Sequence, residues 1–311
     1  MDVQPIKLGT RGSKLALAQA YQVKECLEKV QKRPVEIVVI QTQGDRDLTS
    51  PLVEIGGKGI FTQELEEKLL NRELDGAVHS LKDLPTDLPE GLTIGACLQR
   101  ETTADALVFP ANASHGLLEN LPAGFRIGTS ATRRRAQIQH YNPELELVEI
   151  RGNIHTRIQK LLNGHCDALC LALAGLKRVG LDQDPSIRVM ALPERYFHPA
   201  VAQGCIAIEC RDQKDLIRLF KKVEDPQTEI CVRMERNLLK ELGGGCSLPL
   251  GVHSEVESGE FILNGILFNQ DFSDFVTISG STRDLNDVDF IPNLIYEIKE
   301  RGKGHIIGEP S

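Results

Sequence analysis

The sequence predicts an α/β protein of three domains, of which the last is a small α+β domain. A chain of 311 residues is long enough for two or three domains with separate cores. Apolar strand patterns alternate with amphipathic helix patterns along most of the chain. Residues 166–173 are apolar throughout, which is typical of parallel strands buried on both faces. The C-terminal part instead shows the period-two alternation of antiparallel strands.

The first domain begins with a strand that runs directly into an arginine. Residues 6–10 have the strand pattern, and Arg11, Gly12, Ser13 and Lys14 lead into an amphipathic helix over residues 15–30. Residues 35–41 are rich in β-branched side chains, as buried strands are. Further elements expected here are a helix over residues 61–70 and strands over residues 74–79 and 92–98.

We interpret residues 100–105 as a crossover into the second domain. Its expected strands cover residues 106–109, 125–128, 145–150 and 166–173, with helices starting near residues 131 and 154. Residues 199–209 have the pattern of a loop and strand that returns to the first domain. A helix over residues 224–242, strands over 261–267 and 274–280 and a helix over 288–301 make the third domain. The expected limits are therefore 1–101 with 200–220, 102–199, and 221–311.

Arginines are concentrated at two predicted strand-to-helix junctions. Arg133, Arg134 and Arg135 occupy the first turn of one helix, which Thr129 or Ser130 is expected to cap, and Arg151 and Arg157 surround the start of the next. The helix dipole disfavours cations there, so this placement predicts an anion as the partner. The alternative is a solvated basic face. Ligands of α/β sheets bind at this edge, which favours an anion site.

A lysine and an aspartate follow another predicted strand. Ser80, Lys82 and Asp83 come after residues 74–79 and before two prolines. A Lys-Asp pair is usually a surface ion pair, but its place at a strand end favours a functional role. Neighbouring cations should keep Asp83 ionised.

Composition excludes several classes of function. The formal net charge of −8 argues against a general nucleic-acid binder. We find no leader pattern and no apolar run long enough for a membrane span, so we expect a cytoplasmic protein. The eight cysteines lack zinc-ribbon spacing and should be reduced, mostly as small buried side chains. Residues 56–59 (Gly-Gly-Lys-Gly) do not form a Walker A motif, and we expect either a mobile lid or a plain turn.

Three consecutive glycines precede a cysteine after the long helix. Gly243, Gly244 and Gly245 exceed what a helix end requires before Cys246. Either the backbone turns sharply here or a bulky group approaches it.

Six motifs in this order resemble the porphobilinogen deaminase family, also called hydroxymethylbilane synthases, over nearly the whole chain. They are Gly-Thr-Arg-Gly-Ser-Lys-Leu-Ala at residues 9–16, His-Ser-Leu-Lys-Asp-Leu-Pro at 79–85, Gly-Thr-Ser at 128–130 with Arg133 and Arg134, Arg-Gly-Asn at 151–153 with Thr156 and Arg157, Ala-Gly-Leu-Lys-Arg at 174–178, and Gly-Gly-Cys-Ser at 244–247. The resemblance implies two domains of the periplasmic-binding-protein kind around a cleft, with a small α+β domain carrying a cofactor cysteine.

The resemblance also implies the reaction. The family joins four porphobilinogen molecules head to tail, with release of ammonia, on a dipyrromethane primer bound through a cysteine that corresponds to Cys246. Each pyrrole unit carries two carboxylates, which guanidinium groups bind well. Asp83 matches the catalytic carboxylate that stabilises the cation left when ammonia departs. No metal and no partner beyond porphobilinogen and the growing oligopyrrole are implied, and we expect a monomer.

The other site residues are implied by the same matches. Cofactor-binding positions are Cys246, Lys82, Ser80, Thr129, Ser130, Arg133, Arg134, Arg151, Gly152 and Asp105; substrate-binding positions are Arg11, Ser13, Arg157, Arg178, Gln19, Lys58 and Gln203. Ala202 and Cys205 depart from the family's usual glycine and alanine, which puts the flexibility of this segment in question. The residues at 131–132 and 102–104 also differ from the usual pattern, but the charged groups remain.

A non-catalytic binder of small dicarboxylates is the competing class. Two-domain binders with arginines bind such ligands without chemistry. A cysteine on a glycine-rich loop favours the enzyme, because a passive binder does not need one.

Overall fold

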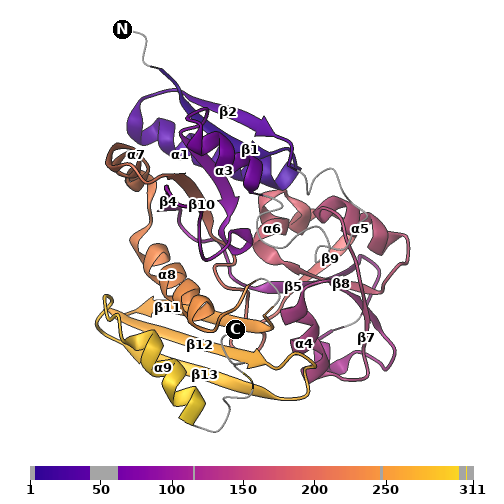
Figure 1. Ribbon diagram of the computed structural model, residues 1–311. Helices are drawn as coiled ribbons and strands as arrows, with labels where there is room; N and C mark the ends of the chain where they lie inside the picture. Colours follow the sequence, from indigo (N-terminus) through magenta and orange to yellow (C-terminus); the bar gives the residue numbers. More distant parts are fainter. Residues whose placement is uncertain (1–3, 43–61, 115, 246–247, 301–305, 307–311) are drawn as a thin grey trace. The chain divides into compact units, whose positions relative to one another are not determined.

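The computed structural model describes residues 4–42, 62–114, 116–245, 248–300 and 306. The chain folds into two compact units (Figure 1): Met1–Glu101 with Gly204–Glu229, and Thr102–Gln203 with Ile230–Ser311. Each unit is therefore built from two separate stretches of the chain. The second unit contains two sheets, and the small C-terminal sheet is one of them.

The first unit is built on a five-stranded sheet of order β2-β1-β3-β10-β4. Its strands are β1 (Ile6–Arg11), β2 (Val35–Ile40), β3 (Gly76–Ser80), β4 (Leu92–Cys97) and β10 (Ile206–Arg211). Strand β1 is parallel to β2 and β3, whereas β10 is antiparallel to both β3 and β4. The returning strand predicted near residues 199–209 is thus a central strand of this sheet.

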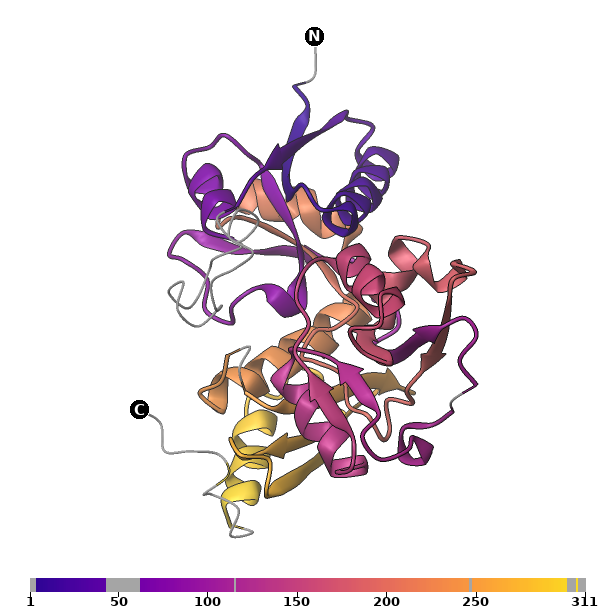
Figure 2. The ribbon, with the colours of Figure 1, turned by 90° about the vertical axis from the view of Figure 1, so that its right-hand side faces the viewer.

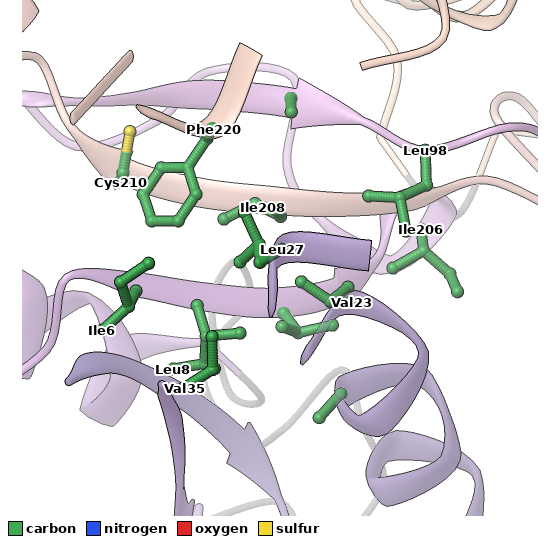
Figure 3. Close-up of a cluster of buried hydrophobic side chains, with 13 residues drawn as sticks. Ile6, Leu8, Val23, Leu27, Val35, Leu98, Ile206, Ile208, Cys210 and Phe220 are labelled. Atoms are coloured by element: carbon green, nitrogen blue, oxygen red, sulfur yellow. The ribbon is translucent and has the colours of Figure 1, made fainter. Parts of the chain in front are cut away.

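Helices cover both faces of the first sheet. Helices α1 (Lys14–Gln31) and α3 (Gln63–Leu70) lie on opposite faces of the sheet (Figure 2). Successive side chains of β3 point to opposite faces, so this strand contacts both helices. Val78 packs toward α1, and Ala77 packs toward α3. Figure 3 shows the α1 side, where Val23 and Leu27 meet Ile208 and Phe220, the last from α7 (Lys214–Phe220).

The second sheet repeats the topology of the first. Its order is β7-β6-β8-β5-β9, with β5 antiparallel to its neighbours and β6 parallel to β7 and β8. The strands are β5 (Asp105–Pro110), β6 (Arg126–Gly128), β7 (Glu146–Val148), β8 (Ala168–Ala172) and β9 (Ile187–Ala191). The helices between them are α4 (Thr132–Tyr141), α5 (Ile154–Leu162) and α6 (Leu173–Arg178).

The C-terminal sheet is an antiparallel meander. It consists of β11 (Leu250–Glu257), β12 (Glu260–Phe268) and β13 (Phe275–Thr282) in that order. Helix α9 (Phe290–Ile298) packs on β13, where Gly280 leaves room for Phe290 and Leu294. Helix α8 (Pro226–Glu241) precedes this sheet, and the boundary between the two compact units falls within it.

The local predictions are largely confirmed, with shifted ends and four omissions among the α-helices and strands, two of them the helices α6 and α7. Strands β9 and β11 were not predicted, and β8 is shorter than the apolar run that contains it. Short 3-10 helices join several elements: η1 (Leu81–Asp83), η2 (Leu118–Asn120), η3 (Leu181–Gln183) and η4 (Lys221–Val223). Within the described ranges, no helix has both the length and the apolar character needed to cross a membrane.

Candidate active site

Polar side chains gather where the parallel strands of the first sheet end. Strands β1 and β3 are parallel neighbours, so Arg11 at the end of β1 and Ser80 at the end of β3 lie at the same sheet edge. Lys82 and Asp83 follow in η1, where Lys82 is half-buried and Asp83 is exposed. The sequence prediction that these residues share one edge is therefore confirmed.

Helix α1 is tied to this edge by two of the predicted residues. The Ser13 hydroxyl caps α1 by accepting from the Ala16 amide at 3.2 Å. Gln19, buried on α1, donates its side-chain amide to the Ser80 hydroxyl at 2.7 Å. Gln19 therefore fixes the position of Ser80.

The second sheet presents a matching edge. Strands β6, β7 and β8 are parallel, so the segments after them, which begin at Thr129, Glu149 and Leu173, lie at one edge. The Ser130 hydroxyl donates to the carbonyl of Ile150 at 2.7 Å and accepts from its amide at 3.2 Å. This pair of bonds joins the first two junctions.

The predicted cap of α4 is wrong. Ala131 is the N-cap residue and makes no side-chain bond to the helix. The Ser130 hydroxyl is used by Ile150, and the Thr129 hydroxyl accepts from the Ala131 amide at 3.3 Å, outside the helix. The long-range bond to Ile150 takes the hydroxyl that local sequence reasoning assigned to the helix.

Arg133 and Arg134 on α4 share one buried carboxylate. Asp105, the first residue of β5, has no exposed surface. One of its oxygens lies 2.7 Å from Arg133 Nη1, and the other accepts from Arg134 Nη2 at 2.7 Å and Nε at 3.1 Å. Each arginine is only 6% exposed. The cluster is thus a buried ionic triad.

The charges of the triad support one another. Burial alone would raise the pKa of Asp105, but the two guanidinium groups outweigh it and hold that pKa below its usual range. Burial lowers the pKa of Arg133, and Asp105 opposes this. Asp105 is thus an anionic partner within the chain for these two arginines, and their burial shows that the alternative of a solvated basic face is wrong for them. The anionic ligand stays a prediction.

Gln203 belongs to the same cluster. Its buried side-chain amide donates to Asp105 Oδ1 at 2.9 Å and to the carbonyl of Thr103 at 2.7 Å. Arg134 Nη1 donates to the carbonyl of Cys170 on β8 at 3.2 Å. Asp105 and Gln203 have no exposed surface, so in this conformation they act by holding the arginines.

The remaining predicted cations of this edge are less buried. Arg151 is half-buried and forms an ion pair with Glu149 at 2.7 Å. Gly152 has φ of 109°, a backbone conformation that glycine adopts readily, and its carbonyl accepts from Arg157 Nε at 2.8 Å. Arg178, also half-buried, lies in α6 after β8. The Arg-Gly-Asn turn thus brings Arg151 and Arg157 to the same edge as Arg133.

Ala202, at a position where glycine is usual in the resembling family, has a left-handed backbone conformation that glycine adopts readily. Its φ is 57°, in the left-handed region, which costs a residue with a Cβ about 1–2 kcal/mol. Its amide donates to Glu235 Oε2 at 2.7 Å, and Ser254 donates to the other oxygen of Glu235 at 2.6 Å. Glu235, a fully buried residue of α8 that the sequence analysis missed, therefore holds the strained turn.

Two predicted residues, Lys58 and Cys246, lie outside the described residues, as does the predicted lid around residues 56–59. The seven described cysteines are free thiols, and all but Cys26 are buried. Burial raises the pKa of Cys170 to about 12, which makes its thiol unreactive. Among the side chains that the structure describes, no cluster of three His, Cys, Asp or Glu could hold a metal ion.

Comparison with known proteins identifies the family. Residues 6–218 match the model described as porphobilinogen deaminase, dipyromethane cofactor binding domain, and residues 229–289 match the C-terminal domain of the same family. The porphobilinogen deaminase of Nostoc sp. is 42% identical over 97% of this chain and 93% of its own. That of Desulforamulus reducens is 40% identical over 95% and 93%. The chain belongs to the porphobilinogen deaminase family.

This membership confirms the function expected from the motifs. Porphobilinogen deaminases are hydroxymethylbilane synthases of tetrapyrrole biosynthesis, and the matched domain is the one that binds dipyrromethane. The non-catalytic binder is not favoured. The fold class is also confirmed, since both five-stranded sheets have the inserted antiparallel strand of periplasmic-binding-protein-like domains, and a small sheet domain follows.

Solved structures of low similarity include ligand-binding domains. One is the GluR0 ligand-binding core in complex with L-glutamate, at 14% identity and a TM-score of 0.39 over 78% of this chain and 95% of its own. Another is the BvgS VFT2 domain of Bordetella pertussis, at 15% identity and a TM-score of 0.44 over 70% and 86%.

The residues present fit a dipyrromethane group chemically. Such a group carries several carboxylates, and the segments that follow the parallel strands of the second sheet contain Arg133, Arg134, Arg151, Arg157 and Arg178. A polyanion is the ligand that such a set of arginines attracts.

Proposed function

We propose that this porphobilinogen deaminase holds the carboxylates of its primer and of the growing chain at the edge of the second sheet. Arg133 and Arg134 would bind the primer, together with Thr129, Ser130, Arg151 and Gly152. We keep Lys82 and Ser80 of the first unit as proposed cofactor contacts from the family match. The observation that carries the proposal is the Asp105 triad, in which a buried carboxylate of the chain itself orients two buried guanidinium groups. Preoriented cations bind an anion without the cost of ordering their side chains.

The more exposed cations would bind incoming substrate. Arg157 and Arg178 are half-buried at the second sheet, and Arg11 and Ser13 lie at the edge of the first. Gln19 acts by orienting Ser80, and we keep Lys58 as a proposed substrate contact from the family match. Asp105 and Gln203 would act as positioning residues, because both are buried within the triad.

Asp83 would supply the catalytic charge. It is exposed at the end of β3, beside half-buried Lys82, so its carboxylate is accessible to a ligand. Loss of ammonia from porphobilinogen leaves a positive charge on the substrate, and a fixed carboxylate lowers the free energy of that cation as it forms. The dipyrromethane, bound through Cys246, supplies the pyrrole carbon to which the first substrate unit is joined.

Intact mass measurement tests the tether. Purified protein should carry an excess mass equal to two linked pyrroles, and Cys246→Ser should remove both this mass and turnover while the fold is retained. Cys26→Ser is the matched control, because Cys26 is a half-buried thiol on α1 and should keep primer and activity. An active Cys246→Ser protein without the adduct would disprove the assignment.

We also propose the domain limits 1–101 with 200–220, 102–199 and 221–311, and a monomer that works in the cytoplasm. The three separate sheets support the count of three domains. The net charge of −8 supports the monomer, because like-charged molecules repel one another. Light scattering of the purified protein at working concentration tests the monomer, and a mass twice that of the chain would disprove it.

A further inference from the structure

Two oxygens, one in an ion pair and one in a hydrogen bond, set the orientation of Arg133. The first is the Asp105 carboxylate at 2.7 Å, and the second is the main-chain carbonyl of His198, which accepts from Arg133 Nη1 at 2.6 Å. Asp105 is itself held by Arg134 and Gln203. The His198 peptide lies between β9 and β10, in a segment without regular structure. Its orientation therefore needs another support.

Gln137 provides that support. It has no exposed surface, and its side-chain amide bonds the His198 main chain twice: Nε2 donates to the carbonyl at 2.9 Å, and Oε1 accepts from the amide at 2.7 Å. Gln137 follows Arg133 by four residues on α4, so the two side chains lie on the same helix face. Both donate to the same carbonyl oxygen, whose two lone pairs are thereby used.

The packing around His198 leaves its peptide little freedom. A Cβ built on Gly251 of β11 would lie 2.8 Å from the His198 carbonyl oxygen and 3.0 Å from Gln137 Nε2. In addition, the Val252 amide donates to the carbonyl of Pro199 at 2.8 Å. The segment is thus held between α4 and β11, and Gln137 fixes which way its carbonyl points.

We propose that Gln137 is a positioning residue for the known reaction: by orienting the His198 carbonyl, it holds the Arg133 guanidinium in the direction that carboxylate binding requires. This inference rests on the proposed role of Arg133. Without the side-chain amide, the carbonyl can rotate away, and the desolvated guanidinium loses this oriented acceptor. Arg133 then populates several orientations, and carboxylate binding weakens.

The test compares Gln137→Met with Ile138→Ala. Methionine keeps the length of the side chain but removes both hydrogen bonds, whereas Ile138 is the next buried residue of the same helix and packs into the core of the second sheet. For Gln137→Met we expect the fraction of chains that carry the primer, measured by intact mass, to fall about 10-fold or more, because Arg133 is assigned to the primer. The KM for porphobilinogen of the loaded chains should stay near that of the parent. Ile138→Ala should lower the thermal midpoint but leave KM and primer loading near those of the parent.

Two further variants make the result decisive. Gln137→Glu retains the acceptor for the His198 amide but loses the donor to its carbonyl, so it should show the same defect as Gln137→Met. Arg133→Leu reports on the proposed function itself. A parent-like primer load in Gln137→Met, with a reduced load in Arg133→Leu, would overturn only this inference, whereas a parent-like load in Arg133→Leu would overturn the role of Arg133. Failure of both Gln137 variants to fold would make Gln137 a folding residue and would also overturn the inference.

Discussion

Asp105→Asn should destabilise the second unit strongly at neutral pH. Asparagine has the same shape, but it leaves Arg133 and Arg134, each 6% exposed, without their counter-charge. Breaking a buried ion pair by removing one partner costs about 3–5 kcal/mol. With about 2–4 °C per kcal/mol for a unit of this size, the thermal midpoint should fall by about 10 °C.

The pH dependence of this loss has a definite sign. The folded-state pKa of Asp105 is lowered, so its contribution to stability is fully present above the unfolded value of about 4 and is lost as pH falls toward the folded value. Thermal unfolding followed by circular dichroism at pH 7 and at pH 3 should therefore show a large difference between parent and variant that shrinks in acid. Primer loading measured by intact mass should fall with the midpoint at pH 7.

Asp167→Asn is the matched control. Asp167 also forms a pair with an arginine, Arg126 at 2.7 Å, but both side chains are more than one third exposed. Water and salt screen such a pair, so its loss should lower the midpoint much less. A midpoint of Asp105→Asn equal to that of the parent at pH 7, or a difference that persists unchanged at pH 3, would refute the reasoning about the triad.

Three other predictions concern separate parts of the molecule. Asp83→Asn should lower the single-turnover rate by about 100-fold or more with an unchanged thermal midpoint, because it removes a charge that acts on the developing cation; an unchanged rate would show that Asp83 has no catalytic role. Gly251→Ala should cost about 1–3 kcal/mol of unfolding free energy, because its methyl group would press on the His198 carbonyl; a parent-like chemical denaturation curve would contradict this. Burial, together with His253 and Arg133, lowers the pKa of His198 to about 4, and its imidazole should titrate there by NMR. Because the unfolded value is about 6.5, the free energy of unfolding should fall as pH drops from about 6.5 toward 4. His198→Gln should flatten that part of the profile of stability against pH.

Local patterns were sufficient for most helices and strands. The apolar period of residues 15–30 predicted a helix, and α1 covers Lys14–Gln31. Strand β9 was not predicted because it is short and carries Arg188, whose guanidinium stacks on Phe109 at 4.6 Å. Strand β11 was not predicted because His253 and Glu255 interrupt its apolar residues. In both cases tertiary contacts stabilise a strand whose own pattern is weak.

The edge of the second sheet was predictable, but the partner of its arginines was not. Strand-to-helix junctions placed Arg133 and Arg151 at one edge of the sheet by the rule that parallel strands end together. The pairing of Arg134 with Asp105 spans 29 residues and depends on β5 lying beside β8 in the middle of the sheet. No local pattern encodes that neighbourhood. The same holds for the Ser130 hydroxyl, which a contact 20 residues away diverts from the helix.

The inserted strand of the first sheet has a consequence for synthesis of the protein on the ribosome. Strand β10 (Ile206–Arg211) lies between β3 and β4, yet it is made after every strand of the second sheet. A nascent chain that has not reached Arg211 therefore exposes unpaired edges on β3 and β4, which are otherwise the interior of a sheet. The second sheet, whose strands all come from one continuous stretch, can close earlier. The order of emergence thus leaves the N-terminal sheet, the first to be synthesised, as the later of the two to be completed, and a chaperone that binds open strand edges would find its target there.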